Sequence, residues 1–337
     1  MMKTLLARLA MAVAVAASFS AAPPARAQEP VVKVGYAKCA HCVPMSLLPE
    51  FAEGVKIEAI GFNTGNDVLT ALVSKSLDVA QVTYLHYVTG LDKGFDLVAI
   101  SGQISGGSAL VIANDLAVNE NDWAGLKALV AAYKAQGKPF RVAASRGNAQ
   151  DIHMRGALLK QGIDPNKDVQ FVNIPNPSDH IQALRRGEVE LISTVEPFAT
   201  QILQAKAAKL FAYPYDQAAG KLTNLIVTRS DVIASNPKAV EAVVKAVVKL
   251  DDKLDADHVL WQGVITKVTG LDKTVADAAI INLYPDYKMH RASAAAIADM
   301  MRDLKYISTD VTKKVEDRMD YSFLEKATGK PKSELGY

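Results

Sequence analysis

The sequence predicts an α/β protein built from two lobes, and three observations lead to this prediction. The 337 residues are 50% hydrophobic and 22% charged, which supports a large core and excludes a disordered chain. Short β-branched runs alternate with helical patterns, as is typical of mostly parallel sheets covered by helices. This alternation starts again near residue 140, so we expect each half of the chain to build its own sheet.

Residues 1–27 have the pattern of a cleaved signal peptide. Lys3 and Arg8 flank the start of a short apolar run, and Ala25-Arg26-Ala27 has the small residues of a cleavage site. The run is too short to span a bilayer, and we find no other membrane segment. Removal of residues 1–27 also removes three positive charges, so the remaining chain has 35 basic and 36 acidic residues and a net charge of −1. We therefore expect a soluble exported protein with no electrostatic reason to bind nucleic acid.

The first half has strand and helix patterns in alternation. A β-branched run that begins at Val31 and closes at Gly35-Tyr36 predicts the first strand. Asn66 follows a polar loop and is the expected N-cap of the second helix. We expect strands over residues 31–36, 55–60, 77–82, 97–100 and 109–113, and helices over 45–53 and 66–75.

The second half repeats this alternation and then becomes helical. From Asn236 onwards, apolar residues recur near a spacing of 3.6, which predicts successive amphipathic helices to the end of the chain. We expect strands over residues 140–144, 169–173, 189–194 and 222–228, and helices from 148 to 162 and over 178–186.

Two segments also resemble each other at an offset of 112 residues. Residues 66–72 align with 178–184, and residues 75–80 align with 187–192, without a gap. Each segment has a capped helix with Ala-Leu on its inner face, a short polar turn and an acid beside the next strand. The matching residues cap, pack and turn, so we infer two copies of one βαβ unit rather than a repeated chemistry.

Two such lobes predict a ligand site in the cleft between them. Parallel sheets bind ligands outside the carboxyl ends of their strands, where helix N-termini attract anions and polar groups. Glu196 follows a strand end that faces the cleft, so its carboxylate is expected to be able to bind an amine or amide group of the ligand. The glycine-rich stretch 102–108 lacks a P-loop lysine and is expected to be a hinge-side loop. The candidates at these ends are Gly65, Asn66, Thr83, Tyr84, Gly107, Ser108, Ser145, Gly147, Asn148, Thr194 and Glu196.

The order and spacing of these motifs resemble the periplasmic substrate-binding proteins of ABC importers for nitrate, taurine and aliphatic sulfonates. Thiamine-pyrimidine binders share that fold. The motifs are Gly65-Asn66-Asp67, Ala71-Leu72, Leu77-Asp78-Val79-Ala80, Ser145-Arg146-Gly147-Asn148, Ala183-Leu184, Gly187, Val189-Glu190 and Glu196-Pro197-Phe198.

This resemblance implies a type II two-lobe fold in which the chain crosses between the lobes twice. We place the crossings near Ala113 and Leu222, so that residues 28–113 with 222–337 form lobe 1 and residues 114–221 form lobe 2. The resemblance further implies a periplasmic protein that captures a small organic anion or zwitterion and delivers it to an inner-membrane permease. We expect a monomer without a cofactor. No catalytic or cofactor motif is present, so we do not expect an enzyme.

One loop departs from the family pattern. After the first strand the chain reads Lys38-Cys39-Ala40-His41-Cys42, where relatives have small or polar residues. The loop faces the pocket in that family, so Cys39, His41 and Cys42 become candidate ligand contacts. In an oxidising compartment Cys39 and Cys42 are expected to form a disulfide. We assign no metal, because three soft ligands lack a clear fourth; copper(I) would suit them better than zinc.

Two alternative functions stay open at this point. The cysteine loop and the aromatic residues Phe62, Tyr84, Tyr87 and Phe198 would suit an aromatic heterocycle such as a thiamine-pyrimidine or a flavin precursor. An exported thiol-disulfide oxidoreductase could use Cys39 and Cys42. The thioredoxin fold of such enzymes does not explain the repeat between the two halves.

Overall fold

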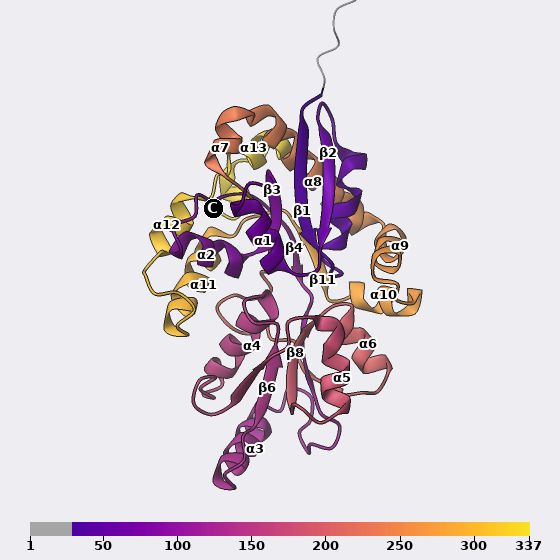
Figure 1. Cartoon of the computed structure of the whole chain (residues 1–337), viewed down its shortest axis with the longest axis vertical. Helices are drawn as coiled ribbons and strands as arrows, with labels where there is room; N and C mark the ends of the chain where they lie inside the picture. Colours follow the sequence, from indigo (N-terminus) through magenta and orange to yellow (C-terminus); the bar gives the residue numbers. More distant parts are fainter. Residues whose placement is uncertain (1–28) are drawn as a thin grey trace, which may run out of the picture.

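The computed structural model describes residues 29–337, which form two lobes with one sheet each (Figure 1). The predicted signal peptide lies outside the described residues. The strand order is β11-β4-β10-β3-β1-β2 in lobe 1 and β7-β6-β8-β5-β9 in lobe 2. Within residues 29–337, no helix combines the length and the apolar character needed to cross a membrane.

The sheet of lobe 1 is mixed, because β10 and β11 run opposite to the other four strands. Strand β1 pairs in parallel with β2 and β3, whereas β10 runs antiparallel between β3 and β4. Strand β11 was not predicted, because it is a four-residue edge strand with Pro285 inside a helical part of the sequence. The strands are β1 (Val31–Ala37), β2 (Lys56–Phe62), β3 (Val79–Thr83), β4 (Val98–Gly106), β10 (Asn224–Thr228) and β11 (Leu283–Asp286).

Helices cover both faces of this sheet and share one large core with it. Thr64, not Asn66, is the N-cap of α1, and it forms a capping box with Asp67. The long helix α8 packs against β4, β11 and η1. The helical segments are η1 (Val43–Phe51), α1 (Gly65–Val73), α2 (Tyr84–Asp92), α7 (Ser230–Ser235), α8 (Pro237–Ala256), α9 (His258–Thr269), α10 (Lys273–Ile280), α11 (Arg291–Asp303), α12 (Thr312–Asp317), α13 (Ser322–Thr328) and η3 (Lys332–Glu334).

Lobe 2 is smaller and has a separate apolar cluster on each face of its sheet. Strands β6, β7 and β8 are parallel, and β5 runs antiparallel between β8 and β9. The elements are β5 (Ser108–Ile112), α3 (Trp123–Ala135), β6 (Arg141–Ala144), α4 (Ala149–Lys160), β7 (Gln170–Asn173), η2 (Pro177–Asp179), α5 (His180–Arg185), β8 (Leu191–Val195), α6 (Phe198–Gln204) and β9 (Lys209–Ala212).

The first crossing between the lobes lies at Gly106–Gly107, so its expected position near Ala113 is wrong. The residues that follow it form β5, which pairs with β8 and β9 of lobe 2. Both glycines have positive φ, 89° and 83°, which disfavours other residues. The second crossing connects β9 to β10. It lies beside the first, because Gly106 N–H donates to Lys221 O at 2.8 Å and Thr223 Oγ1 donates to Gly106 O at 2.8 Å.

The structure confirms that the two lobes contain the same unit of architecture. Strands β3 and β8 begin at residues 79 and 191, which is the predicted offset. Each is third from one edge of its sheet, beside a parallel pair of strands. The turns before them use left-handed residues at equivalent positions, Lys75 with φ 64° and Gly187 with φ 62°. Asp78 and Glu190 then accept a hydrogen bond from a backbone N–H of β1 and β6 respectively.

The left-handed turn gives a direct test of this backbone requirement. A Cβ at Gly187 would meet nothing within 4 Å, so Gly187→Ala changes backbone strain alone. We expect it to lower the free energy of unfolding by about 1–2 kcal/mol. The matched control is Gly263→Ala in α9, which also has open space at Cβ and should raise the free energy by about 0.5–1 kcal/mol. Urea titrations measure both, and equal effects would contradict the assignment.

Candidate functional site

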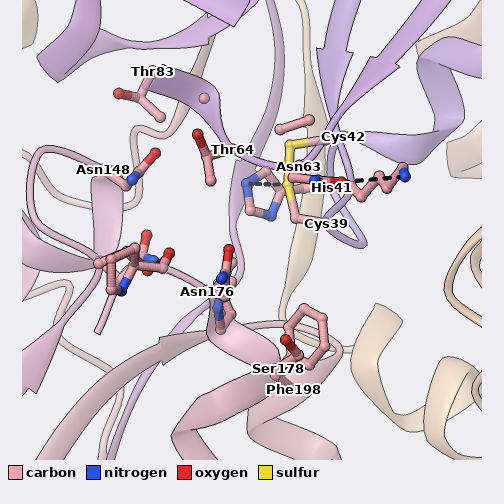
Figure 2. Close-up of a pocket in the computed structure, with 18 of the residues that line it drawn as sticks. Cys39, His41, Cys42, Asn63, Thr64, Thr83, Asn148, Asn176, Ser178 and Phe198 are labelled. Carbon is pink, nitrogen blue, oxygen red and sulfur yellow. Dashed lines mark hydrogen bonds between the residues drawn. A yellow bond between two sulfur atoms is a disulfide. The ribbon is translucent and has the colours of Figure 1, made fainter. Parts of the chain in front are cut away.

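The carboxyl ends of strands from both sheets meet at a cavity of about 450 Å³ between the lobes (Figure 2). Lobe 1 contributes the segments that follow β1 and β2, the end of β3, the start of β10 and the end of α9. Lobe 2 contributes the end of β8 and the segments that follow β6, β7 and β8. The lining residues are Ala37, Lys38, Cys39, His41, Cys42, Asn63, Thr64, Gly65, Gln81, Val82, Thr83, Ser145, Asn148, Gln150, Pro175, Asn176, Pro177, Ser178, Val195, Phe198, Asn224, Val268 and Thr269.

The two lobes touch each other around this cavity, so the structure is a closed form. Ala40 N–H donates to Glu196 O at 3.0 Å, and Asn66 Nδ2 donates to Arg146 O at 3.4 Å. The segments 65–67 and 145–148 therefore face each other, as the predicted cleft requires. Farther out, the Tyr306 hydroxyl of lobe 1 donates to the buried carboxylate of Asp151 in lobe 2, and α10 packs against α6.

Three helix N-termini border the cavity. The N-cap residues of α1, α2 and α4 are Thr64, Thr83 and Asn148, and all three line it. Thr64 and Thr83 each accept a hydrogen bond from the third N–H of their helix at 3.2 Å. Asn148 makes no side-chain capping bond, so its amide is available to a guest. The free N–H groups and positive ends of these helices favour a negatively charged or strongly polar ligand.

The charged side chains around the cavity favour the same kind of ligand. Among residues 29–337, no Asp or Glu lines the cavity, and Lys38 is the one Lys or Arg that does. Its ammonium group donates to Asn63 Oδ1 at 3.3 Å. Most other polar groups on the wall are neutral amides and hydroxyls. An anion would therefore meet donors without meeting a repelling carboxylate.

The loop of residues 39–42 forms a rigid part of the cavity wall. Cys39 and Cys42 form a disulfide, as predicted. Trp261 Nε1 donates to Ala40 O at 3.0 Å. Gln81 Nε2 and Asn224 Nδ2 donate to His41 O at 3.2 and 3.3 Å. The His41 ring is buried, and burial lowers its pKa to about 3, with a smaller effect from the charge of His153.

The other buried histidines hold the cleft segments in place. Burial lowers the pKa of His86, His153 and His180 to about 4 in each case, so all three are neutral at pH 7. Thr83 N–H donates to His86 Nδ1 at 3.2 Å, so Nε2 carries the proton and donates to Asn66 Oδ1 at 3.1 Å. This bond positions Asn66 for its contact with Arg146 O.

His153 and His180 make closely similar bonds. In each ring Nε2 donates to a backbone carbonyl, Leu222 O at 3.0 Å and Ile174 O at 3.1 Å. Because a carbonyl only accepts, Nδ1 must accept from a hydroxyl in return. The hydroxyl is Ser108 Oγ for His153 and Thr194 Oγ1 for His180, both at 2.8 Å. His153 thereby connects both crossings between the lobes, and His180 connects the ends of β7 and β8.

The predicted site residues fall into two groups. Seven line the cavity, namely Cys39, His41, Cys42, Gly65, Thr83, Ser145 and Asn148. Five others form its supports. Asn66 and Gly147 lie at the contact between the lobes, and Gly107 and Ser108 lie at the first crossing. The fifth support is Thr194, which forms a hydrogen bond with His180.

Tyr84 and Glu196 are corrections to the predicted set, because both side chains turn into the protein. The ring of Tyr84 is 2% exposed, and its hydroxyl donates to Met289 O at 2.9 Å. The Glu196 carboxyl is also buried, and it accepts from Thr200 N–H at 3.0 Å. Burial raises the pKa of Glu196 to about 7, against the opposing effect of its Thr200 hydrogen bonds. Glu196 therefore cannot receive an amine in the cavity.

Sequence reasoning also missed several polar wall residues. Thr64 could have been found from its capping-box spacing to Asp67. Asn176 and Ser178 follow the end of β7 and share the logic applied to the other strand ends. Gln81 and Asn224 lie inside strands, where no local pattern distinguishes a cavity residue from a core residue. The missed residues are Asn63, Thr64, Gln81, Gln150, Asn176, Ser178 and Asn224.

Comparison with known proteins identifies the family of the chain. Residues 25–260 match the model of the NMT1-like family, which is more than half of the chain. The chain belongs to the NMT1-like family. A 123-residue segment, 36% of the chain, is 31% identical to the nitrate/nitrite binding protein NrtA of Synechococcus elongatus. That alignment spans 28% of the relative's length.

Solved structures confirm the fold of this NMT1-like protein. The periplasmic nitrate-binding protein NrtA of Synechocystis PCC 6803 superposes with a TM-score of 0.78 at 17% identity, over 90% of each chain. The alkanesulfonate-binding protein SsuA of Xanthomonas axonopodis pv. citri, bound to MOPS, gives 0.72 at 17% identity, over 88% of this chain and 100% of that one. The resemblance drawn from the motifs is thus confirmed. The fold these structures share with the chain is not that of a thioredoxin-like oxidoreductase.

The buried neutral histidines predict a marked loss of stability in acid. Their pKa values lie near 3 to 4 in the folded state and near 6.5 in the unfolded state, so the unfolded chain binds more protons between these values. The stability present above pH 6.5 is therefore lost as the pH falls towards 4, by about 1.4 kcal/mol per pH unit for each histidine. Glu196 and Asp251, whose pKa values are raised by burial, act in the opposite direction over this range, but they are two groups against four.

Urea unfolding at pH 7.5, 6.5, 5.5 and 5.0 measures this dependence. We expect His180→Gln to reduce the slope below pH 6.5 by about the contribution of one histidine. The matched control is His258→Gln, because His258 is exposed on α9 and should leave the slope unchanged. A wild-type curve that is flat between pH 6.5 and 5.0 would refute the neutral state of these rings.

Proposed function

We propose that this protein is the solute-binding component of an ABC import system and that it captures a small organic anion in the cleft. It is exported to the periplasm, acts as a monomer and hands its guest to a permease in the inner membrane. The observation that carries the proposal is the cavity between the lobes. Its wall has three helix N-termini and Lys38, and no carboxylate from the described part of the chain, residues 29–337. Contacts from both lobes to one guest would stabilise the closed form.

The size and the apolar part of the cavity favour an organic anion over a bare inorganic one. A volume of about 450 Å³ corresponds to roughly fifteen water molecules at about 30 Å³ each. A nitrate ion would occupy a small part of that space. Phe198, Val195 and Val268 offer an apolar surface for a short carbon chain, while the helix ends offer donors to its anionic group. The relatives bind nitrate or nitrite and alkanesulfonates, which supports an anion as the guest class.

The other ligand classes have less support. A zwitterion such as taurine needs an acceptor for its ammonium group, and Glu196, the carboxylate predicted for that role, points away from the cavity. An aromatic heterocycle needs aromatic walls, and of the four aromatic residues predicted to stack only Phe198 lines the cavity. Tyr84 and Tyr87 are buried in the core of lobe 1 instead.

A thermal-shift screen of the purified protein tests the proposal. The panel contains short alkanesulfonates, carboxylates, nitrate, bicarbonate, taurine, pyrimidines and flavins. We expect alkanesulfonates or comparable organic anions to raise the melting temperature most, because a guest at 100 times its Kd stabilises the native state by about 2.7 kcal/mol. A response to heterocycles alone would overturn the anion assignment. Silence across the panel, in protein freed of bound guest by unfolding and refolding, would overturn the binding proposal.

Gly65 provides a test of closure that does not depend on the precise guest. A Cβ at this position would lie 2.6 Å from His86 Cε1 in lobe 1 and 2.9 Å from Asn148 Oδ1 in lobe 2. Gly65→Ala should therefore oppose closure and raise the Kd for an alkanesulfonate by at least tenfold, about 1.4 kcal/mol, in calorimetric titration. Gly263→Ala serves as the control with open space. An unchanged Kd would contradict the closed geometry as the binding state.

A further inference from the structure

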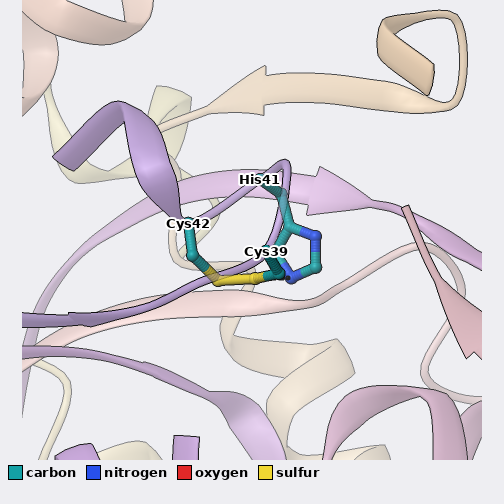
Figure 3. Close-up of side chains that lie close together, drawn as sticks. All are labelled: Cys39, His41 and Cys42. Carbon is teal, nitrogen blue, oxygen red and sulfur yellow. Dashed lines mark hydrogen bonds between the residues drawn. A yellow bond between two sulfur atoms is a disulfide. The ribbon is translucent and has the colours of Figure 1, made fainter. Parts of the chain in front are cut away.

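The loop of residues 39–42 carries chemistry that anion capture does not use. Cys39 Sγ, Cys42 Sγ and one His41 ring nitrogen lie within 4.8 Å of one another (Figure 3). His41 Nε2 is 3.3 Å from Cys39 Sγ. Its other ring nitrogen is buried and has no hydrogen-bond partner among the described residues. A buried nitrogen without a partner is costly, so the placement of this ring against sulfur calls for a function.

We propose that the reduced form of this loop binds one soft d¹⁰ cation, such as copper(I), through Cys39 Sγ, Cys42 Sγ and His41 Nε2. The site forms when a dithiol reductant transfers two electrons and two protons to the disulfide. The bond between the two sulfurs breaks, and the reductant itself becomes a disulfide. The cation then displaces the two thiol protons and binds the thiolates. This is a second binding activity, separate from the anion site in its donors and in its redox state.

Backbone hydrogen bonds hold the loop in place independently of the disulfide. Cys42 N–H and Val43 N–H both donate to Cys39 O at 2.8 Å. The loop carbonyls accept further bonds from Trp261, Gln81 and Asn224. None of these bonds uses a sulfur atom or the imidazole ring, so reduction leaves them intact. Metal–sulfur bonds of about 2.3 Å place two sulfurs roughly 4 Å apart, which side-chain rotation can reach.

The donor set selects the class of cation. Two thiolates and one imidazole are soft ligands, which prefer copper(I) to magnesium, calcium or manganese. Structural zinc requires four protein ligands, and the described residues bring three side chains together here. All three residues line the cleft cavity, and Cys39 is only partly buried, so a cation can reach the site from the cleft.

The test compares the two redox states of the wild-type mature chain without any anionic guest. The protein is reduced with dithiothreitol, desalted without oxygen and titrated with copper(I) against the chromogenic chelator bicinchoninate. We expect one copper(I) per reduced chain and none per oxidised chain. Equal binding in both states would overturn the proposal, as would zinc(II) binding more tightly than copper(I). The anion screen is run on the oxidised protein, so the failure of either proposal is seen separately.

Variants identify the ligands. The double variant Cys39→Ser with Cys42→Ser should bind no copper(I) under reducing conditions, and its circular dichroism reports whether it is folded. His41→Ala should weaken binding by more than the roughly 10–100-fold expected for loss of an outer-shell partner. His258→Ala, at an exposed histidine of α9, should match the wild type. Wild-type affinity in His41→Ala would exclude the imidazole and overturn the three-ligand site. Should the double variant fail to fold, the redox comparison on the wild type still decides.

Discussion

The rest of the structure depends on one constraint, the first crossing between the lobes, which is made by Gly106 and Gly107. Any side chain at Gly106 would overlap Asn282 O, the acceptor of the Gly107 N–H bond at 2.8 Å. A Cβ at Gly107 would lie 2.7 Å from His41 Nδ1. The side chain of Asn282 in turn donates to Ser108 O at 3.2 Å. These contacts hold the crossing, the edge of lobe 1 and the cysteine loop in fixed relative positions. The position of the cavity wall depends on all three.

Buried polar side chains transmit this constraint to the cavity. Neutral histidines are suited to the task, since one ring donates to a carbonyl and accepts from a hydroxyl without bringing charge into the interior. His153 connects both crossings, and His180 connects two strand ends of lobe 2. The cavity wall likewise has few charged side chains. Helix ends supply positive potential there, and none of the described residues that line the cavity is an Asp or Glu. A guest anion would therefore be the dominant negative charge there.

The sequence predicted the architecture better than the wall of the site. The offset of 112 residues located β3 and β8 correctly, because capping, packing and turn residues are local signals. The first crossing was misplaced, since β5 has the same apolar pattern whichever sheet receives it. Tyr84 was assigned to the cavity because it follows a strand end, but the first turn of α2 directs it into the core. Gln81 and Asn224 gave no signal, because both lie within strands.

The adjacency of the two crossings also has a consequence for the history of such proteins. All of lobe 2 lies in one uninterrupted stretch, and its entry and exit are joined by the bond from Thr223 Oγ1 to Gly106 O at 2.8 Å. Exchange of that stretch between related genes would replace nine of the 23 residues that line the cavity in one recombination event and leave the fold of lobe 1 continuous. Specificity could then change by transplantation of a module, faster than by the accumulation of point mutations.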